Sequence, residues 1–403
     1  KMKRRIHLNL FIYARGHHEA AWRHPKAPEW SLMDIRHYVA CARKAEAACF
    51  DSIFLADVLN LPPDADASAR IWLEPLTTLS AIAMATSRIG LIGTASTTHT
   101  EPFNLARQFA SLDHISSGRA AWNIVTSFSA AGSRNFDSSG RLAHADRYAR
   151  GDEFVEIVKK LWDSWSDDAV VDDRAAGTFY VKVRVRSIDH DGTYYHIAGP
   201  LNLPRSPQGR PVLVQAGSSE AGKDYAAKHA EAVFTAHMHQ STAQDFYGDL
   251  KRRVRAVGRR AEQCLVLPGI SVMIAGTEAE AKRMEAELNE MSDVATGLTR
   301  LSDRFDGHDF SRIPLDRVLT VDDFPDPAAN EGSRGRTELI VGAVARDALT
   351  MRQLLGKLAG ARGHFVIAGT PEQVADAMEA WVDEGAADGF NVMPLLLPHM
   401  LDV

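Results

Sequence analysis

Short apolar runs alternate with longer amphipathic stretches, and this rhythm restricts the fold more than any single motif. Buried parallel strands are near-continuous apolar runs, whereas helices place apolar residues every three to four positions. Eight strand-like runs recur: Ile6–Phe11, Ser52–Asp57, Ile89–Thr94, Ala120–Thr126, Pro211–Gly217, Ala232–Thr235, Leu265–Ala275 and Phe390–Leu397. With helical stretches between them, they favour a closed (β/α)8 barrel over an open doubly wound sheet. We therefore predict an α/β TIM barrel.

Helix signals lie between these runs. Ser31–Asp34 has the spacing of a capping box and predicts a helix that extends to about Cys49. Thr370 followed by Pro371 predicts an N-cap and first helical residue. Further helices are expected at 72–86, 102–115, 146–165, 220–230, 243–257 and 278–291.

Two stretches depart from the rhythm, at about 167–210 and 296–346. In the first, Val181–Arg186 alternates apolar and basic residues and Gly192–Ile197 is strand-like, so we predict antiparallel strands with Lys182, Arg184 and Arg186 in solvent. The second is rich in Gly, Pro and polar residues, and loops of that length are usually functional or mobile. We expect one domain over residues 1–403 with these two insertions. Because a closed barrel needs a helix after its last strand, we expect that helix to be missing from this chain, which ends at Val403.

Charge and composition exclude several classes of protein. The net charge is −6, so the chain lacks the basic balance of a nucleic-acid-binding protein. No segment approaches the roughly twenty apolar residues that span a bilayer, and we expect no membrane partner. The three cysteines have neither CxxC nor metal-ligand spacing, which suits a reducing cytoplasm.

Polar side chains follow several of the predicted strands, where a barrel collects its functional groups. The first strand is followed by His17 and His18, the second ends at Asp57, and the third leads into Thr94–Thr98. The fourth offers Asn123, Thr126 and Ser127; beyond it His144 and Tyr148 are four residues apart and share a face if that segment is helical. Ser218 and Ser219 follow the fifth strand.

Residue types alone leave alternatives open at these positions. Ser218 and Ser219 fit either a phosphate cradle at a helix N-terminus or an ordinary N-cap. Asp57 fits a base, a cofactor ligand or an N-cap. The histidines match no zinc spacing, so we expect no metal. Dinucleotide, Walker A and G-x-S-x-G motifs are absent from the sequence.

Nine motifs in chain order resemble the flavin-dependent monooxygenases of the bacterial luciferase-like superfamily. The resemblance is to the branch of nitrilotriacetate, EDTA, dibenzothiophene-sulfone and long-chain alkane monooxygenases. The motifs are Trp22–Pro25, Phe54–Asp57, Ser111–Arg119, Ala121–Ser127, His144–Tyr148, Gly199–Asn202, Ser206–Gly209, Gln215–Ser219 and Asp388–Asn391. They span nearly the whole chain, so the resemblance does not rest on a single match.

This resemblance implies an enzyme that uses reduced FMN and O2 to oxygenate a small organic molecule through a flavin hydroperoxide. A separate NAD(P)H:flavin reductase would supply the reduced FMN. The implied flavin-binding residues are Asp57, Thr94, Thr97, Asn123, His144, Tyr148, Ser218 and Ser219. His17 would face the substrate side and is the predicted catalytic residue. The 296–346 insertion would cover the pocket, and a homodimer or homotetramer is expected.

The substrate does not follow from the resemblance, and a sulfone, an amine polycarboxylate or an alkane is equally compatible with it. A deazaflavin-dependent oxidoreductase that transfers hydride is one alternative function on the same barrel. A flavin-binding protein without catalytic activity is another.

Overall fold

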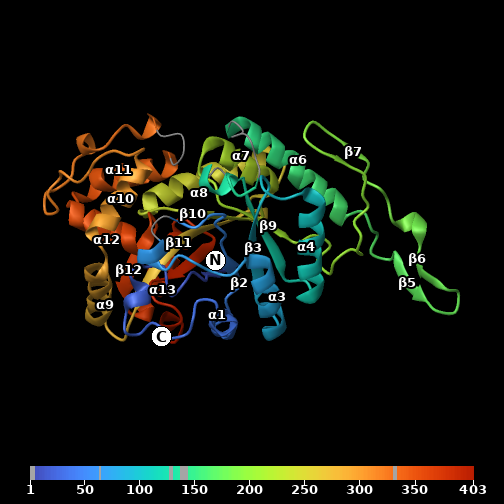
Figure 1. Cartoon of the computed structure of the whole chain (residues 1–403), viewed down its shortest axis with the longest axis horizontal. Helices are drawn as coiled ribbons and strands as arrows, with labels where there is room; N and C mark the ends of the chain where they lie inside the picture. The colour runs from blue at the N-terminus through green and yellow to red at the C-terminus, as the bar shows by residue number, and fades with distance from the viewer. Residues whose placement is uncertain (1–4, 63–64, 127–129, 137–143, 330–333) are drawn as a thin grey trace.

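A closed barrel of parallel strands forms the centre of the protein (Figure 1). This computed structural model describes residues 5–62, 65–126, 130–136, 144–329 and 334–403. The barrel strands are β1 (His7–Phe11), β2 (Ser52–Leu55), β3 (Gly90–Ser96), β4 (Ala120–Val125), β9 (Val212–Gln215), β10 (Ala232–Thr235), β11 (Leu265–Ile274) and β13 (Gly389–Pro394). They pair in this order, and β13 pairs with β1 to close the ring. The predicted barrel is confirmed.

Helices surround the strands and cover the outside of the barrel (Figure 1). The outer helices are α1 (Ile35–Ala47), α3 (Pro75–Ala85), α4 (Pro102–Ile115), α6 (His144–Trp162), α7 (Glu220–His229), α8 (Gln240–Ala256), α9 (Glu278–Met291) and α13 (Pro371–Asp383). Two single-turn helices, α2 (Ala65–Ser68) and α5 (Ala130–Ser133), lie in loops. None of the helices in the described part of the chain is long and apolar enough to cross a membrane.

Two predicted helix starts differ from the structure because another residue provides the cap. The predicted capping box at Ser31 is wrong: α1 begins one turn later, where the Asp34 carboxylate accepts the backbone N–H of Arg36 at 2.9 Å. In α3, Glu74 caps the helix and Pro75 occupies the first turn, so the helix starts after Trp72. The predicted bounds of α4 are confirmed.

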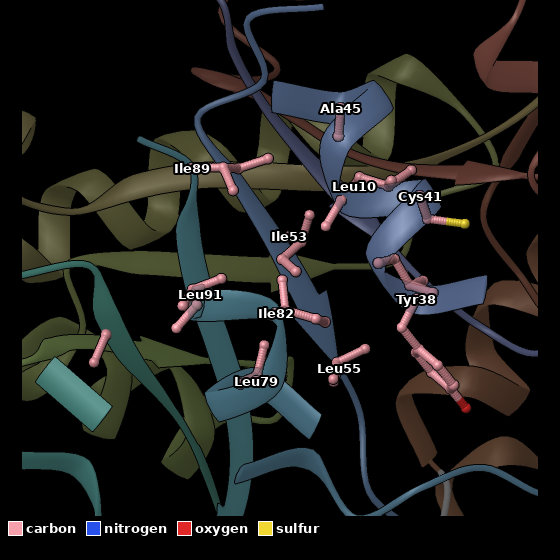
Figure 2. Close-up of a cluster of buried hydrophobic side chains, with 14 of the residues drawn as sticks. Leu10, Tyr38, Cys41, Ala45, Ile53, Leu55, Leu79, Ile82, Ile89 and Leu91 are labelled. Atoms are coloured by element: carbon pink, nitrogen blue, oxygen red, sulfur yellow. The ribbon is translucent and has the colours of Figure 1, made fainter. Parts of the chain in front are cut away.

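The barrel strands bury both of their faces. Outside the barrel, Leu10, Ile53 and Leu91 pack against α1 and α3, including Tyr38 and Leu79 (Figure 2). Inside, a separate cluster fills the lumen with Phe54, Ile92, Ala121, Val214, Ala232, Phe234 and Leu267. Burial on both faces explains the near-continuous apolar runs in the sequence.

The first insertion forms two small hairpins that project away from the barrel (Figure 1). They pair β5 (Val170–Asp173) with β6 (Thr178–Tyr180), and β7 (His190–Asp191) with β8 (His196–Ile197). The predicted strand Val181–Arg186 is wrong, because Lys182–Arg184 forms a 3-10 turn. The predicted strand Gly192–Ile197 is reduced to its last two residues.

The second insertion is largely helical. Instead of a long loop, it contains α10 (Val294–Arg304), the 3-10 turns Val321–Asp323 and Pro327–Ala329, and α11 (Arg334–Asp347). It leads into α12 (Met351–Ala361) and β12 (Phe365–Gly369), a strand that the sequence did not predict and that pairs with β11. We call the cluster that joins these helices the insertion core: Met238, Leu301, Phe305, Phe310, Leu319, Phe324, Ile340, Ala343, Val344, Leu349, Met351 and Leu354.

Candidate functional site

A hydroxyl and an amide meet at the carboxyl ends of β3 and β4. The two strands are paired so that Thr94 lies opposite Asn123. The Thr94 hydroxyl donates to the carbonyl oxygen of Leu55 at 3.0 Å, and the Asn123 amide nitrogen donates to the Thr94 hydroxyl at 2.9 Å. Both side chains are buried, and the Asn123 Oδ1 atom accepts no hydrogen bond from the described residues. A buried acceptor without a donor is costly, so this oxygen is suited to a ligand N–H.

A second polar group lies at the N-terminus of α7. Ser219 caps this helix, and its hydroxyl accepts the backbone N–H of Gly222 at 3.1 Å. A Cβ atom at Gly222 would lie 3.0 Å from both the Ser219 Oγ and the Tyr148 hydroxyl oxygen, so the missing side chain leaves room where two hydroxyls converge. Hydroxyls and free backbone N–H groups at a helix N-terminus favour an anion.

Thr97 lies close to this second group. Its backbone N–H donates to the carbonyl oxygen of Val125 at 2.9 Å. A Cβ atom at Gly151 would lie 3.4 Å from Thr97 Oγ1 and 3.3 Å from the Tyr225 hydroxyl, whose ring packs edge-on against Tyr148 at 5.5 Å. The structure therefore brings Thr97, Tyr148 and Ser219 to one side of the barrel mouth, together with Thr94 and Asn123. We call these five residues the hydroxyl–amide side.

Three other predicted flavin-binding residues are not part of this group. The side chain of His144, the first residue of α6, lies outside the described part of the structure, as does Ser127. Ser218 lies against the first turn of α11, since a Cβ atom at Gly335 would be 2.7 Å from the Ser218 Oγ. Asp57 follows β2; burial, and then Glu74, raise its pKa to about 6. A carboxylate with that pKa changes its charge near neutral pH.

His17 lies across the barrel mouth, in the loop that follows β1. Its backbone N–H donates to the carbonyl oxygen of Pro394 at 2.9 Å, and Gly16 permits this approach because a Cβ there would lie 2.1 Å from the carbonyl oxygen of Leu395. The His17 Nε2 atom lies 2.9 Å from the Phe11 carbonyl oxygen, and Nδ1 lies 2.8 Å from Nη2 of Arg362.

These contacts determine the tautomer of His17. A carbonyl only accepts and a guanidinium only donates, so Nε2 carries the proton and Nδ1 accepts from Arg362. Burial, and then the charge of Arg362, lower the pKa of His17 well below its usual value, so the ring is neutral. Because both ring nitrogens have hydrogen-bond partners, His17 orients the Arg362 side chain. The predicted catalytic role of His17 stays a prediction.

Arginines that the sequence analysis missed surround a pocket beside His17. Arg70, Arg300, Arg304 and Arg362 all line it, together with Tyr13. The Arg362 guanidinium lies 4.2 Å from the centre of the Tyr13 ring, and Arg70 Nε donates to the Tyr13 hydroxyl at 3.0 Å. We call these four arginines with Tyr13 the arginine pocket. Arg300 and Arg304 lie one turn apart on α10, a spacing that would have been informative had α10 been predicted as a helix.

The electrostatics of the arginine pocket are those of crowded cations. Burial, followed by the charges of Arg362, Arg70 and Arg300, lowers the pKa of Arg304 to about 10. Burial would raise the pKa of the Tyr13 hydroxyl, but Arg362 and Arg70 lower it below its usual value. Among the described lining residues Glu19 is the one carboxylate, and it pairs with Arg300. Arginines therefore outnumber carboxylates among the described residues that line this pocket.

Two phenylalanines connect His17 with the inside of the barrel. The Phe11 ring packs edge-on against His17, with ring centres 4.6 Å apart, and lies tilted against Phe54 at the same distance. Phe54 in turn packs on Phe234 at 4.8 Å, inside the barrel. A chain of aromatic rings therefore runs from His17 into the barrel lumen.

Comparison with known proteins identifies the family. Residues 9–388 match the family described as luciferase-like monooxygenase. The chain belongs to this family. It is therefore an oxidoreductase of the monooxygenase type, and the resemblance inferred from the motifs is confirmed.

Two curated relatives and one solved structure extend this result. The chain is 45% identical to N-acetyl-S-(2-succino)cysteine monooxygenase of Bacillus subtilis, over 100% of this chain and 90% of the relative. It is 42% identical to nitrilotriacetate monooxygenase component A of Aminobacter aminovorans, over 99% and 90%. A crystal structure of a riboflavin lyase with modified FMN and riboflavin has a TM-score of 0.84 and 29% identity, over 98% of this chain and 88% of that one.

Proposed function

We propose that this protein is the oxygenating component of a two-component monooxygenase. It would take reduced FMN from a separate NAD(P)H:flavin reductase and use O2 to oxygenate a small organic substrate. The homologous monooxygenases and the structure with modified FMN support this assignment. The observation that carries it is the pairing of a buried acceptor, Asn123 Oδ1, with the anion-binding N-terminus of α7 on one side of the barrel mouth.

These residues fit FMN chemically. The pyrimidine edge of the flavin ring has an N–H group that can donate to Asn123 Oδ1. The phosphate would be held by the N-terminus of α7 with the Ser219 and Tyr148 hydroxyls, with Ser218 and His144 as further candidates. Asp57, Thr94 and Thr97 would line the ring. Bound reduced FMN supplies the electrons with which O2 is activated.

The chain's own contribution is binding, orientation and exclusion of water. The Phe11 and Phe54 rings would form an apolar surface that keeps solvent from the reacting centre. Thr94, held by the Leu55 carbonyl oxygen, fixes the rotamer of Asn123 before the cofactor arrives. The insertion would close over the substrate as a lid, and a homodimer or homotetramer is part of the same proposal.

Turnover with a flavin reductase, NADH and isotopically labelled O2 tests the function. The expected result is incorporation of one labelled oxygen atom into a substrate. The proposal is lost if reduced FMN does not bind, or if no compound of a broad panel acquires the label. A parallel titration with a deazaflavin distinguishes the alternative, because preferential deazaflavin binding would indicate hydride transfer instead.

A further inference from the structure

Tyr13 occupies a tightly packed position at the barrel mouth. It follows β1 and lines the arginine pocket, and it also borders a second pocket together with Trp72. The Arg362 guanidinium lies 4.2 Å from the centre of the Tyr13 ring, the His17 ring is stacked at 5.1 Å, and Trp72 lies tilted at 5.2 Å. Phe11 packs edge-on at 5.7 Å. Because these neighbours hold the ring in one orientation, its hydroxyl group has a fixed direction before any ligand binds.

The hydroxyl oxygen of Tyr13 already accepts a hydrogen bond. Arg70 Nε donates to it at 3.0 Å. A guanidinium cannot accept a hydrogen bond, so the hydrogen of the Tyr13 hydroxyl must point away from Arg70. Tyr13 donates no hydrogen bond to any residue in the described part of the chain. This hydrogen is therefore available to a molecule that enters the pocket.

The two histidines that line the same pocket do not provide such a donor. Both ring nitrogens of His17 have partners within the protein. His18 accepts the backbone N–H of Ala20 at Nδ1, so its Nε2 carries the proton and donates to Asn289 Oδ1 at 3.0 Å. A molecule in the pocket can therefore receive from Tyr13 a hydrogen bond that neither histidine is free to make.

The charges beside Tyr13 make its hydroxyl a better donor. Burial would raise the pKa of this group, but Arg362 and Arg70 lower the pKa below its ordinary value. A more acidic O–H group forms a stronger hydrogen bond with an oxygen acceptor. The hydroxyl is thus suited to orient a neutral oxygen, such as that of a carbonyl, as well as the oxygen of an anion.

We propose that the Tyr13 hydroxyl donates a hydrogen bond to an oxygen atom of the substrate and holds the substrate in the arginine pocket by that oxygen. The inference rests on the proposed monooxygenase function and narrows the substrate to molecules with an oxygen acceptor, such as a carbonyl, carboxylate or sulfone group. It excludes an unsubstituted alkane, because a site built around a hydrogen bond rejects an analogue that cannot form it. Tyr13 is then a residue that determines substrate specificity.

Two neutral ligands of nearly the same shape test this inference. They are cyclohexanone and methylenecyclohexane, in which a methylene group replaces the carbonyl oxygen. Ligand-observed NMR titration of the full chain should give an affinity about 10-fold higher for the ketone. Tyr13→Phe keeps the ring and removes only the hydroxyl, so it should abolish this preference and leave the affinity for methylenecyclohexane within about twofold. A merely structural role of Tyr13 would instead weaken both ligands equally and overturn the inference.

Tyr38→Phe is the matched control. Tyr38 is a buried tyrosine that borders the second pocket but does not line the arginine pocket, and its hydroxyl oxygen accepts the backbone N–H of Leu73 at 3.4 Å. This variant should keep the preference for the ketone. Equal binding of the two ligands by the wild type, or an unchanged preference in Tyr13→Phe, would overturn the inference.

A crystal structure of the wild-type chain with cyclohexanone tests the same contact without a variant. The carbonyl oxygen should lie about 2.7–2.8 Å from the Tyr13 hydroxyl oxygen. A ketone bound in the pocket with its oxygen directed away from Tyr13 would contradict the proposal.

FMN affinity, measured by flavin fluorescence on the same preparations, separates this inference from the proposed function. Tyr13→Phe should leave FMN affinity within about twofold, since the residues proposed for the flavin are on the hydroxyl–amide side. If FMN affinity falls together with ketone affinity, Tyr13 belongs to the cofactor site and the inference is wrong. If the wild type binds FMN but does not distinguish the two ligands, the inference fails while the function stands. If it distinguishes the ligands but does not bind FMN, the function fails while the ligand contact of Tyr13 stands.

Discussion

The two sides of the barrel mouth are built differently. Residues of the hydroxyl–amide side are uncharged and lie on or next to barrel strands and their helices, where backbone pairing fixes them: Thr94 opposite Asn123, and Ser219 at a helix cap. The arginine pocket is charged, and its members come from loops, from α10 of the insertion and from the C-terminal end of α12. In the proposed function the barrel would hold the cofactor, and α10 of the insertion contributes two of the arginines that line the neighbouring pocket.

The largest expected effect is a loss of FMN affinity after a substitution at the N-terminus of α7, on the hydroxyl–amide side. Gly222→Val should weaken FMN binding at least about 100-fold, because its side chain would occupy the space where the Ser219 and Tyr148 hydroxyls converge. Gly248→Val on α8 is the control, since no heavy atom lies within 4 Å of its Cβ position. FMN affinity within twofold of the wild type would show that the α7 N-terminus is not the phosphate site.

Replacing the buried amide should have opposite effects on binding and stability. Asn123→Leu removes the acceptor proposed for the flavin ring, and FMN affinity should fall about 10- to 100-fold. Without FMN, unfolding free energy should stay constant or rise by about 1 kcal/mol, because an unpaired buried oxygen is removed. Titration and urea unfolding measure the two quantities. Asn104→Leu, on the exposed face of α4, is the control. A variant destabilised by several kcal/mol would indicate a structural role for Asn123.

His18, which lines the arginine pocket, should make the protein less stable in acid. Burial lowers the pKa of His18 to about 4, well below its ordinary value of 6.5. Its neutral form is therefore favoured in the folded state, and the resulting stability is present above pH 6.5 and lost as the pH falls toward 4. His18→Gln should reduce the loss of unfolding free energy between pH 7 and 5 by about 1–2 kcal/mol. His196→Gln, at an exposed position, is the control. Identical pH profiles for His18→Gln and wild type would contradict the prediction.

Asp57 should change the pH dependence of the unfolding free energy in the opposite direction from His18. This is the smallest of the expected effects. Its pKa is raised from 3.8 to about 6, so the protonated carboxyl is favoured in the folded state. That stability is present below pH 3.8 and lost as the pH rises through about 6. The unfolding free energy of Asp57→Asn relative to wild type should therefore increase by about 1 kcal/mol between pH 4 and 8. This value allows for the partial exposure of the carboxyl group to solvent. Chemical unfolding at pH 4 and pH 8 measures the difference, with Asp376→Asn as the control. If the variant were stabilised more at pH 4 than at pH 8, the raised pKa of Asp57 would be contradicted.

The sequence indicated which residues of the hydroxyl–amide side would lie near each other, but it did not indicate the arginine pocket. The polar tip of β4 and the Ser pair after β9 directly follow apolar strands, and strand ends gather at one face of a barrel, so their proximity could be inferred. Arg70, Arg304 and Arg362 are separated by long stretches of chain and share no local pattern. Gly and Pro residues also suggested a loop at 296–346, whereas the helices there are stabilised by tertiary packing in the insertion core.

The insertion core also bears on how such enzymes diversify. Leu301 and Phe305 lie beside the pocket arginines of α10, and they pack with Leu354 in a hydrophobic cluster distinct from the one that fills the barrel lumen. Because the two clusters share no residue, a substitution in the insertion core is expected to act on α10 rather than on the strands that carry Thr94 and Asn123. Under the proposed function, substitutions in the insertion core would alter the pocket that α10 lines and leave the proposed flavin-binding residues in place.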